Sequence, residues 1–470
     1  MFLNYRKNQP TGQHYMKSKL QNKQDTREML VSGNVFKTML TLSVPAVLGM
    51  VVIGLYNFMD AVFVGQMVGP VAMTAVKVSY PFTLINSGIA TLIGQGSASV
   101  LSRAIGERDK DTVDRIMGNL ISFVTLLSAI VIVVGLIFTR QLLTLAGAEG
   151  EVLEQAIRYL RIVFCGSLFV NLGQSTNMIM RGEGKLKKAM IIMATSAILN
   201  IILDPILIKV LGAENGVLGA AFATIISQFV LMCMSFFYFI KKSDTVRIHK
   251  IRFEGKLVKP VLGVGVSAML MQVMSMVQQT ILYNTAAKWG GSEWQTILGA
   301  ALSLQAFAFI PLWGISQGFQ PAIGTNYGAK RFDRVGAFTR TFMISATVVA
   351  LLFYVPIMCF PVKMLSMFIT DAAIVQTGAP MLRVIFGAYI CYGVLILSIT
   401  FFQAIGKAGG ASILALARQL VLFLPLVVIL PHIAGFGVKG VFYAQLITDL
   451  VVLLLAIILM IKAFAGFKKN

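Results

Sequence analysis

The 470-residue sequence carries little charge for its length. Asp, Glu, Lys and Arg together make up 13% of the residues, whereas 57% are hydrophobic and the mean hydropathy is +0.80. Soluble domains contain about 25% charged residues. A soluble chain of this length would form about three domains, and it would lack the polar side chains to cover them. The composition excludes a soluble enzyme or a disordered protein and indicates a surface that mostly contacts lipid.

Cysteine and histidine are also scarce, with four and three residues. The cysteines lie far apart in apolar stretches and form no CxxC pair: Cys165, Cys233, Cys359 and Cys391. We therefore expect buried free thiols, no disulfide framework and no zinc site. The first 35 residues are polar and basic, without the apolar run of a signal peptide. Met1 and Met16 are both compatible with a translation start.

Nucleotide-binding and catalytic motifs are missing as well. A phosphate-binding loop needs Ser or Thr after its Gly-Lys pair, but Gly184-Lys185 is followed by Leu186 and Gly406-Lys407 by Ala408. No nucleophile or metal-centred constellation stands out. We expect no enzyme activity and no cofactor, so uphill transport would draw its energy from an ion gradient.

The hydrophobic residues form long runs that predict membrane-spanning helices. About 20 apolar residues cross a bilayer as a helix, and lipid admits only helices or closed barrels. These runs are too long for barrel strands, which predicts an all-α membrane protein. The twelve predicted spans are 38–65, 71–101, 116–138, 158–180, 189–210, 217–240, 260–287, 296–324, 340–360, 380–404, 411–431 and 438–461.

The distribution of basic residues predicts the orientation of the spans. The net charge is +21, but most of the Lys and Arg lie in the tails and in alternate short loops. This pattern favours an anionic membrane surface over nucleic acid as the partner and places both termini in the cytoplasm. The predicted units are an N-terminal tail (1–35), a six-helix lobe (36–240), a basic linker (241–259), a second six-helix lobe (260–463) and a C-terminal tail (464–470).

The two predicted lobes resemble each other in sequence. Gly106 matches Gly328, and Gly184-Lys185 matches Gly406-Lys407, at one offset of 222 residues. Three further small residues, Gly216, Gly219 and Ala223, match Gly437, Gly440 and Ala444 at an offset of 221. Six spans per lobe give both halves the same orientation. The lobes should then be related by a pseudo-twofold axis along the membrane normal, with a translocation cavity between them.

Three carboxylates fall well inside predicted spans: Asp60, Asp204 and Asp449. A charge at the membrane centre costs about 2.5–3.5 kcal/mol, so such residues are candidates for function. Tyr56 and Asn57 precede Asp60 by one helical turn and share its face. Asp449 lies near Gln445 and Thr448, and either a functional role or a helix-joining role fits it.

Of the three carboxylates, Asp204 has the most candidate oxygen ligands near it in the sequence. Asn200 lies one turn before it, and Pro205 removes the N–H that the Ile201 carbonyl would accept. A carboxylate, an amide oxygen and a free carbonyl are thereby brought together. Clustered oxygens suit a hard cation such as Na⁺, and a poorly solvated carboxyl group suits a proton. The alternative is an Asp–Asn hydrogen bond that only joins helices, which contributes about 0.6 kcal/mol.

With these residues in view, the chain resembles the multidrug and toxic compound extrusion (MATE) transporters over residues 35–463. The resemblance rests on SVPAVLGMVVIGLYNFMDAVFVGQ (43–66), GQGSASVLSRAIGERD (94–109), RGEGKLKKAMIIMATSAILNIILDPILI (181–208) and GVLGAAFATIISQ (216–228). The Asn200–Pro205 run is most similar to the DinF-like or MepA-like branch. This resemblance implies two lobes and alternating access. It also implies a coupling site of Asp60, Asn200, Asp204 and Thr224 that binds Na⁺ or H⁺.

The resemblance implies an antiporter that exports amphipathic, cationic drugs or toxic compounds in exchange for H⁺ or Na⁺. We expect a monomer in the bacterial inner membrane. The alternative is a flippase for lipid-linked saccharides of the same superfamily, which would need several basic residues in its cavity. Only Lys77 and Arg383 are candidates for that role. The substrate, the coupling ion and the stoichiometry stay open.

Overall fold

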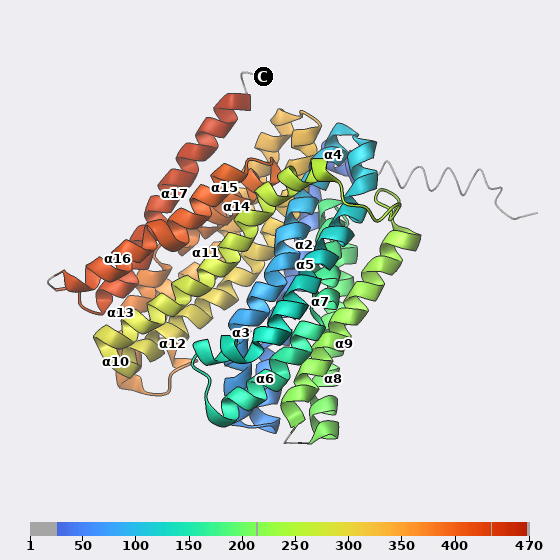
Figure 1. Ribbon diagram of the computed structural model, residues 1–470. Helices are drawn as coiled ribbons and strands as arrows, with labels where there is room; N and C mark the ends of the chain where they lie inside the picture. The colour runs from blue at the N-terminus through green and yellow to red at the C-terminus, as the bar shows by residue number, and fades with distance from the viewer. Residues whose placement is uncertain (1–25, 213–214, 434, 468–470) are drawn as a thin grey trace, which may run out of the picture.

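The computed structural model describes residues 26–212, 215–433 and 435–467. Within this part of the chain every regular element is a helix, as predicted (Figure 1). In Figure 1 the helices α3–α9 gather on one side and α11–α17 on the other, with the two groups leaning against each other. The all-α fold with two groups of helices agrees with the predicted fold class.

The first group contains helices α2 to α9 and two π-helical turns. Their bounds are α2 (Val35–Met67), α3 (Pro70–Ala90), η1 (Thr91–Gln95), α4 (Gly96–Glu107), α5 (Lys110–Leu145), α6 (Gly150–Cys165), α7 (Ser167–Gly182), α8 (Leu186–Leu211), α9 (Gly216–Phe237) and η3 (Tyr238–Lys242). The second group follows residues 243–254, which form no helix.

The second group begins with α10, in which two helices follow each other across a kink at Gly291. The bounds are α10 (Gly255–Gly328), α11 (Phe332–Cys359), α12 (Pro361–Ser366), α13 (Ala372–Phe386), η4 (Tyr389–Cys391), α14 (Tyr392–Ala404), α15 (Ala408–Leu416), η5 (Ala417–Val421), α16 (Phe423–Ile429), η6 (Leu430–His432) and α17 (Lys439–Phe467). The two helices of α10 contain the predicted spans 260–287 and 296–324, and the kink lies at Gly291, which has φ 68°.

The internal repeat appears in the backbone as well as in the sequence. Two non-glycine residues of the described chain have positive φ, Arg108 at 63° and Lys330 at 56°. They lie 222 positions apart, each at the end of a helix that contacts the other group. Gly184 and Gly406, a pair at the same offset, also share positive φ values of 83° and 75°. The matching turns show that equivalent helices of the two halves end with the same backbone conformation.

The two groups meet where small residues allow backbones to touch. A Cβ on Gly318 or Gly314 of α10 would lie within 3.2 Å of Leu42 or Val47 of α2. A Cβ on Gly265, in the first part of α10, would lie 1.8 Å from the Leu92 carbonyl oxygen. The first span of each half therefore packs on the second span of the other half, which is the pattern that a twofold axis produces.

The sequence predicted continuous spans, whereas several spans of the structure are bent or contain a π-helical turn. In the described residues nine helices are long and apolar enough to cross a membrane, and α6 with α7 forms a tenth span bent by 53°. The π-helical turns η1 and η5 lie inside the predicted spans 71–101 and 411–431. These bends and wide turns depend on contacts between helices, so the length of an apolar run does not predict them.

The prediction of buried cysteines is wrong for most of them. Cys165, Cys233 and Cys359 are exposed and Cys391 is partly exposed, and all four are free. An apolar run does not distinguish the face of a helix that packs on neighbours from the face that meets lipid.

Candidate functional site

Helices α8 and α9 approach each other closely and bring three of the predicted site residues together. A Cβ on Gly219 of α9 would lie only 2.7 Å from the backbone nitrogen of Ile208 of α8, so a larger residue would separate the helices. Asn200 and Asp204 lie on the face of α8 that this contact buries, with exposures of 1% and 0%. Thr224 follows Gly219 by about one turn and lies opposite Asn200.

The side chain of Asn200 connects Asp204 to α9. With its amide oriented to satisfy both neighbours, the Asn200 nitrogen donates to Asp204 Oδ2 at 3.0 Å and its oxygen accepts from the Thr224 backbone N–H at 3.2 Å. This orientation follows from the hydrogen-bond network. Among the described residues no N–H or O–H donates to the other carboxyl oxygen, Asp204 Oδ1, although it is buried.

Asp60 of α2 lies within hydrogen-bonding reach of Asp204. Tyr56, one turn earlier on α2, lies within hydrogen-bonding reach of Thr224. Tyr159 of α6 is buried beside the pair and close enough to interact electrostatically with both carboxyl groups. The structure thus brings Asp60, Asn200, Asp204 and Thr224 to one pocket together with Tyr56. The Asn57 side chain lies outside the described residues.

This geometry constrains the charge of the pair. Two ionised carboxylates have no hydrogen to donate, so a hydrogen bond between Asp60 and Asp204 requires one proton. Like charges at this distance repel strongly when both groups are ionised. A monovalent cation between them would relieve the repulsion as a shared proton does. The residues that could surround it supply carboxylate, amide, hydroxyl and carbonyl oxygens, which suit a hard cation.

Pro205 lies within α8 without ending the helix. The Ile201 carbonyl on the preceding turn therefore lacks its usual helical donor. Apolar residues of the surrounding helices, among them Val64, Val163, Ile208 and Val217, pack together around this part of the fold. The pocket is thus polar inside an apolar surrounding, where unpaired charge is costly.

Asp449 belongs to a separate cluster in the second group of helices. Its Oδ1 accepts from Arg418 Nε at 2.8 Å and its Oδ2 accepts from the Tyr392 hydroxyl. The Arg418 guanidinium also lies over the Tyr392 ring at 4.9 Å, and Gln305 donates to the Tyr392 hydroxyl at 2.9 Å. Asp449 is therefore neutralised by an arginine and does not join the Asp60–Asp204 pocket.

Sequence reasoning missed Arg418, Tyr392 and Tyr159. It predicts no role for Arg418, which lies in the η5 turn with its side chain 16% exposed. The internal repeat could have indicated that Arg418 and Asp449 lie close together. Arg418 and Asp449 correspond to Ser196 and Ser227 at the offset of 222, and Ser196 donates to the Ser227 carbonyl at 2.7 Å. A contact between two helices in one half is thus replaced by an ion pair in the other.

Comparison with known proteins gives the family. The MatE family model matches residues 45–206 and 266–429, which is one stretch in each half of the chain. The chain belongs to the MatE family. The Multidrug export protein MepA of Staphylococcus aureus (strain MRSA252) is 29% identical over 422 residues, which cover 88% of this chain and 91% of that protein. These matches agree with the resemblance found in the sequence.

Solved structures of MatE-type transporters share the fold. The structure of a MATE transporter in complex with MaL6 has a TM-score of 0.89 at 26% identity and covers 95% of this chain and 100% of that chain. An outward-facing conformation of a multidrug resistance MATE family transporter of the MOP superfamily has a TM-score of 0.88, also at 26% identity, with 95% and 99% covered. This chain is therefore a multi-pass membrane protein of a transporter family.

The two basic residues that the sequence offered for a saccharide flippase, Lys77 and Arg383, do not lie in the interior. Lys77 is exposed. Arg383 is also exposed, and its Nε donates to the Met358 carbonyl at 2.9 Å. Neither residue supports the flippase alternative.

Proposed function

We propose that this MatE family member is a secondary antiporter that exports amphipathic, cationic compounds in exchange for H⁺ or Na⁺. The observation that carries the proposal is the contact between Asp60 of α2 and Asp204 of α8 in a buried pocket. Such a pair needs one monovalent cation to be stable. The name of the MepA relative, a multidrug export protein, supports drugs as the substrate class.

The pocket couples ion and substrate through its charge. With a proton or Na⁺ bound, the Asp60–Asp204 pair carries one net negative charge, and α2 can rest against α8. When the cation leaves, repulsion between the carboxylates favours separation of α2 from α8. Because only one of these arrangements suits the cation, its binding shifts the balance between conformations. A cationic substrate would be favoured by the cation-free, more negative state.

The driving force is sufficient for export. One charge that crosses 100 mV releases about 2.3 kcal/mol, and each pH unit adds about 1.4 kcal/mol. Exchange of one H⁺ for one neutral compound can therefore use both contributions. Exchange for a monovalent cation uses the chemical gradient alone.

We infer the orientation from the basic residues of one end of the molecule, which we call the basic end. At this end the described part of the chain starts with residue 26, α4 ends, and α11 begins. Arg27, Arg108, Lys185 and Lys330 all belong to this end. The excess of Lys and Arg in cytoplasmic loops places the basic end in the cytoplasm. We propose a monomer in the bacterial inner membrane with both termini on that side.

Transport by the purified protein in proteoliposomes tests the proposal. Vesicles receive an imposed pH gradient, a Na⁺ gradient or neither, and the movement of several fluorescent cations is followed. We expect one of the two gradients to drive accumulation of the cations. Equal movement with and without both gradients would refute ion coupling, and movement of a fluorescent lipid in place of the cations would favour a flippase.

A further inference from the structure

Of the chain before α2, the described residues 26–33 form a short segment at the basic end, which we call the N-terminal strap. Residues 26–31 are helical, and the Leu30 side chain is 1% exposed. The strap continues directly into α2 through Asn34, whose side chain accepts from the Lys37 N–H at 3.0 Å and caps the helix. The strap is thus joined covalently to the first group of helices.

The strap is also hydrogen-bonded to the first group. Arg27 donates through Nε to the Ile105 carbonyl at 3.1 Å and through Nη2 to the Gly106 carbonyl at 2.9 Å. These carbonyls end α4, where a cation is favoured by the helix dipole. Lys185, before α8, donates to Thr26 Oγ1. Three contacts therefore tie the strap to α4 and α8.

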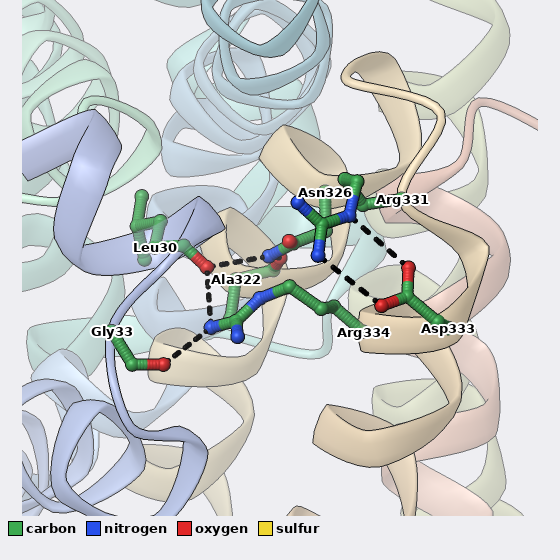
Figure 2. A network of polar contacts seen from close by, with 7 residues as sticks. All are labelled: Leu30, Gly33, Ala322, Asn326, Arg331, Asp333 and Arg334. Carbon is green, nitrogen blue, oxygen red and sulfur yellow. Dashed lines mark hydrogen bonds and ion pairs between the residues drawn. The ribbon is translucent and has the colours of Figure 1, made fainter.

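The other side of the strap contacts the second group (Figure 2). Arg334 of α11 donates through Nη2 to the carbonyls of Leu30, at 3.2 Å, and Gly33, at 2.6 Å. Asn326 of α10 donates to the same Leu30 carbonyl at 2.9 Å. Figure 2 shows all these groups converging on the end of the strap helix. The strap crosses the boundary between the two groups.

A second segment crosses the same boundary in the opposite direction. Residues 250–254, which precede α10 and which we call the linker strap, pack on α5 of the first group. The Glu254 N–H donates to Asn119 Oδ1 at 3.0 Å, and Phe253 packs on Phe123 with ring centroids 4.6 Å apart. A Cβ on Gly118 would lie 1.9 Å from the Lys250 carbonyl oxygen. Each half thus sends the segment before its first helix to the third span of the other half.

These two straps lie over a closed crossing of helices α4 and α10. Ser99 of α4 donates to the Gln403 carbonyl of α14 at 2.5 Å, and a Cβ on Gly324 would lie 2.1 Å from Ser102 Oγ. No passage to the basic end can open while these contacts hold. Any opening there must also pull at least one strap from the opposite group.

We propose that the N-terminal strap is a latch that holds the transporter closed at the basic end, with Arg334 and Asn326 as the positioning residues that grip it. This inference rests on the alternating opening in the proposed function. The strap is tied to the first group by the chain itself and by Arg27. The contacts released on opening are therefore those of Arg334 and Asn326 with the Leu30 and Gly33 carbonyls.

The test measures the distance between the two groups directly. Spin labels are attached to cysteines introduced at the exposed positions Asp114 of α5 and Ala337 of α11, in a chain whose four native cysteines are replaced by alanine and which still transports. Distance distributions are recorded without substrate or gradient for Arg334→Gln, Asn326→Ala and Arg334→Lys. Arg340→Gln, an exposed arginine of the same helix, is the matched control.

Loss of charged hydrogen bonds should raise the ratio of open to closed molecules about tenfold in Arg334→Gln, and by less in Asn326→Ala. Arg334→Lys should recover part of the closed population, because an ammonium group can still reach one carbonyl. The control Arg340→Gln should give the same distance distribution as the spin-labelled parent chain that carries neither the Arg334 nor the Asn326 substitution. If Arg334→Gln does not fold, the distance distribution of Asn326→Ala decides whether the strap acts as a latch.

The latch proposal would be overturned if folded Arg334→Gln or Asn326→Ala gave the same distance distribution as the spin-labelled parent chain. The strap would then only anchor the fold, which a lower unfolding temperature without a distance change would show. The outcome is independent of the coupling proposal, because a failure of ion coupling would appear in transport and not in these gradient-free distances.

Discussion

Gly106 and Gly328 each press against the backbone of the other's helix. A Cβ on Gly106 would lie 2.1 Å from the Thr325 carbonyl oxygen, and a Cβ on Gly328 would lie 2.2 Å from the Arg103 carbonyl oxygen. The two residues are related by the repeat and cross at the basic end. Because only glycine permits this approach, the pair keeps α4 and α10 in backbone contact.

Replacing Gly106 by alanine should weaken closure of the basic end. The added methyl group forces α4 from α10, and such overpacking costs about 1–3 kcal/mol. We expect a larger open population in the label-distance measurement and a lower transport rate. Gly409→Ala is the matched control, since a Cβ there meets nothing within 4 Å. An unchanged distance distribution in Gly106→Ala would argue against this crossing as part of the closed state.

The Arg418–Asp449 pair gives a stability prediction. Asp449→Leu leaves the Arg418 guanidinium buried without its carboxylate, which costs about 3–5 kcal/mol. Replacing both residues, as Arg418→Met with Asp449→Leu, should recover most of the lost stability. Thermal unfolding of the purified variants in detergent measures both effects. A double variant as unstable as the single one would show that the pair acts through more than its charges.

Ion-coupled transport should survive in that double variant. Asp449 is neutralised in the second group and takes no part in the Asp60–Asp204 pocket. Gradient-driven uptake by the double variant, compared with the wild type at equal protein content, measures this. Loss of the gradient response in a stable double variant would assign Asp449 to the coupling site.

The sequence predicted the features that depend on local pattern. Apolar runs predicted the helices, and the repeat at an offset of 222 predicted two similar halves. The i, i+4 spacing predicted the contact between Asn200 and Asp204. That Asp60 and Thr224 join them came from family resemblance. Their role in coupling stays a prediction.

Features that depend on packing between distant segments could not be predicted. Arg418 and Asp449 are 31 residues apart on different helices, so no local spacing connects them. The bend between α6 and α7 follows Cys165 at Gly166, where a Cβ would lie 2.5 Å from the Ile225 side chain. Exposure of the cysteines depends on which helix face meets lipid, which apolar composition leaves open.

Asn200 should influence the pH or Na⁺ dependence of transport. Its amide donates to Asp204 Oδ2, which stabilises the ionised carboxylate more than the protonated one. Asn200→Ala removes this donor, so the pH profile of H⁺-coupled transport should differ from that of the wild type. If Na⁺ is the coupling ion, the loss of an oxygen ligand should raise the half-saturating Na⁺ concentration several-fold. Thr195→Ala, an exposed position of the same helix, is the control.

Asp109 gives a stability prediction outside the membrane. Its carboxylate caps α5, and hydrogen bonds from the Thr112 hydroxyl and N–H hold the pKa of Asp109 below its ordinary value. Asp109→Ala should cost about 1 kcal/mol of stability at neutral pH. Because the folded pKa is lowered, the cap stabilises the protein above about pH 4 and is lost as the pH falls through the folded pKa.

Unfolding of Asp109→Ala and wild type at several pH values measures this effect. The difference between the two should shrink below about pH 4. Asp114→Ala, an exposed residue of the same helix, should show little change. A difference that is constant down to low pH would contradict the capping explanation.

Uptake of a fluorescent cation by wild type and Asp204→Asn, in proteoliposomes with the gradient that drives the wild type, tests the central claim most directly. The substituted amide would keep the shape of the side chain but hold no titratable proton and no charge for a cation. We predict that the wild type accumulates the cation, that Asp204→Asn and Asp60→Asn do not, and that Asp333→Asn at the exposed surface behaves as the wild type. Gradient-driven accumulation by Asp204→Asn at the wild-type rate would contradict the account.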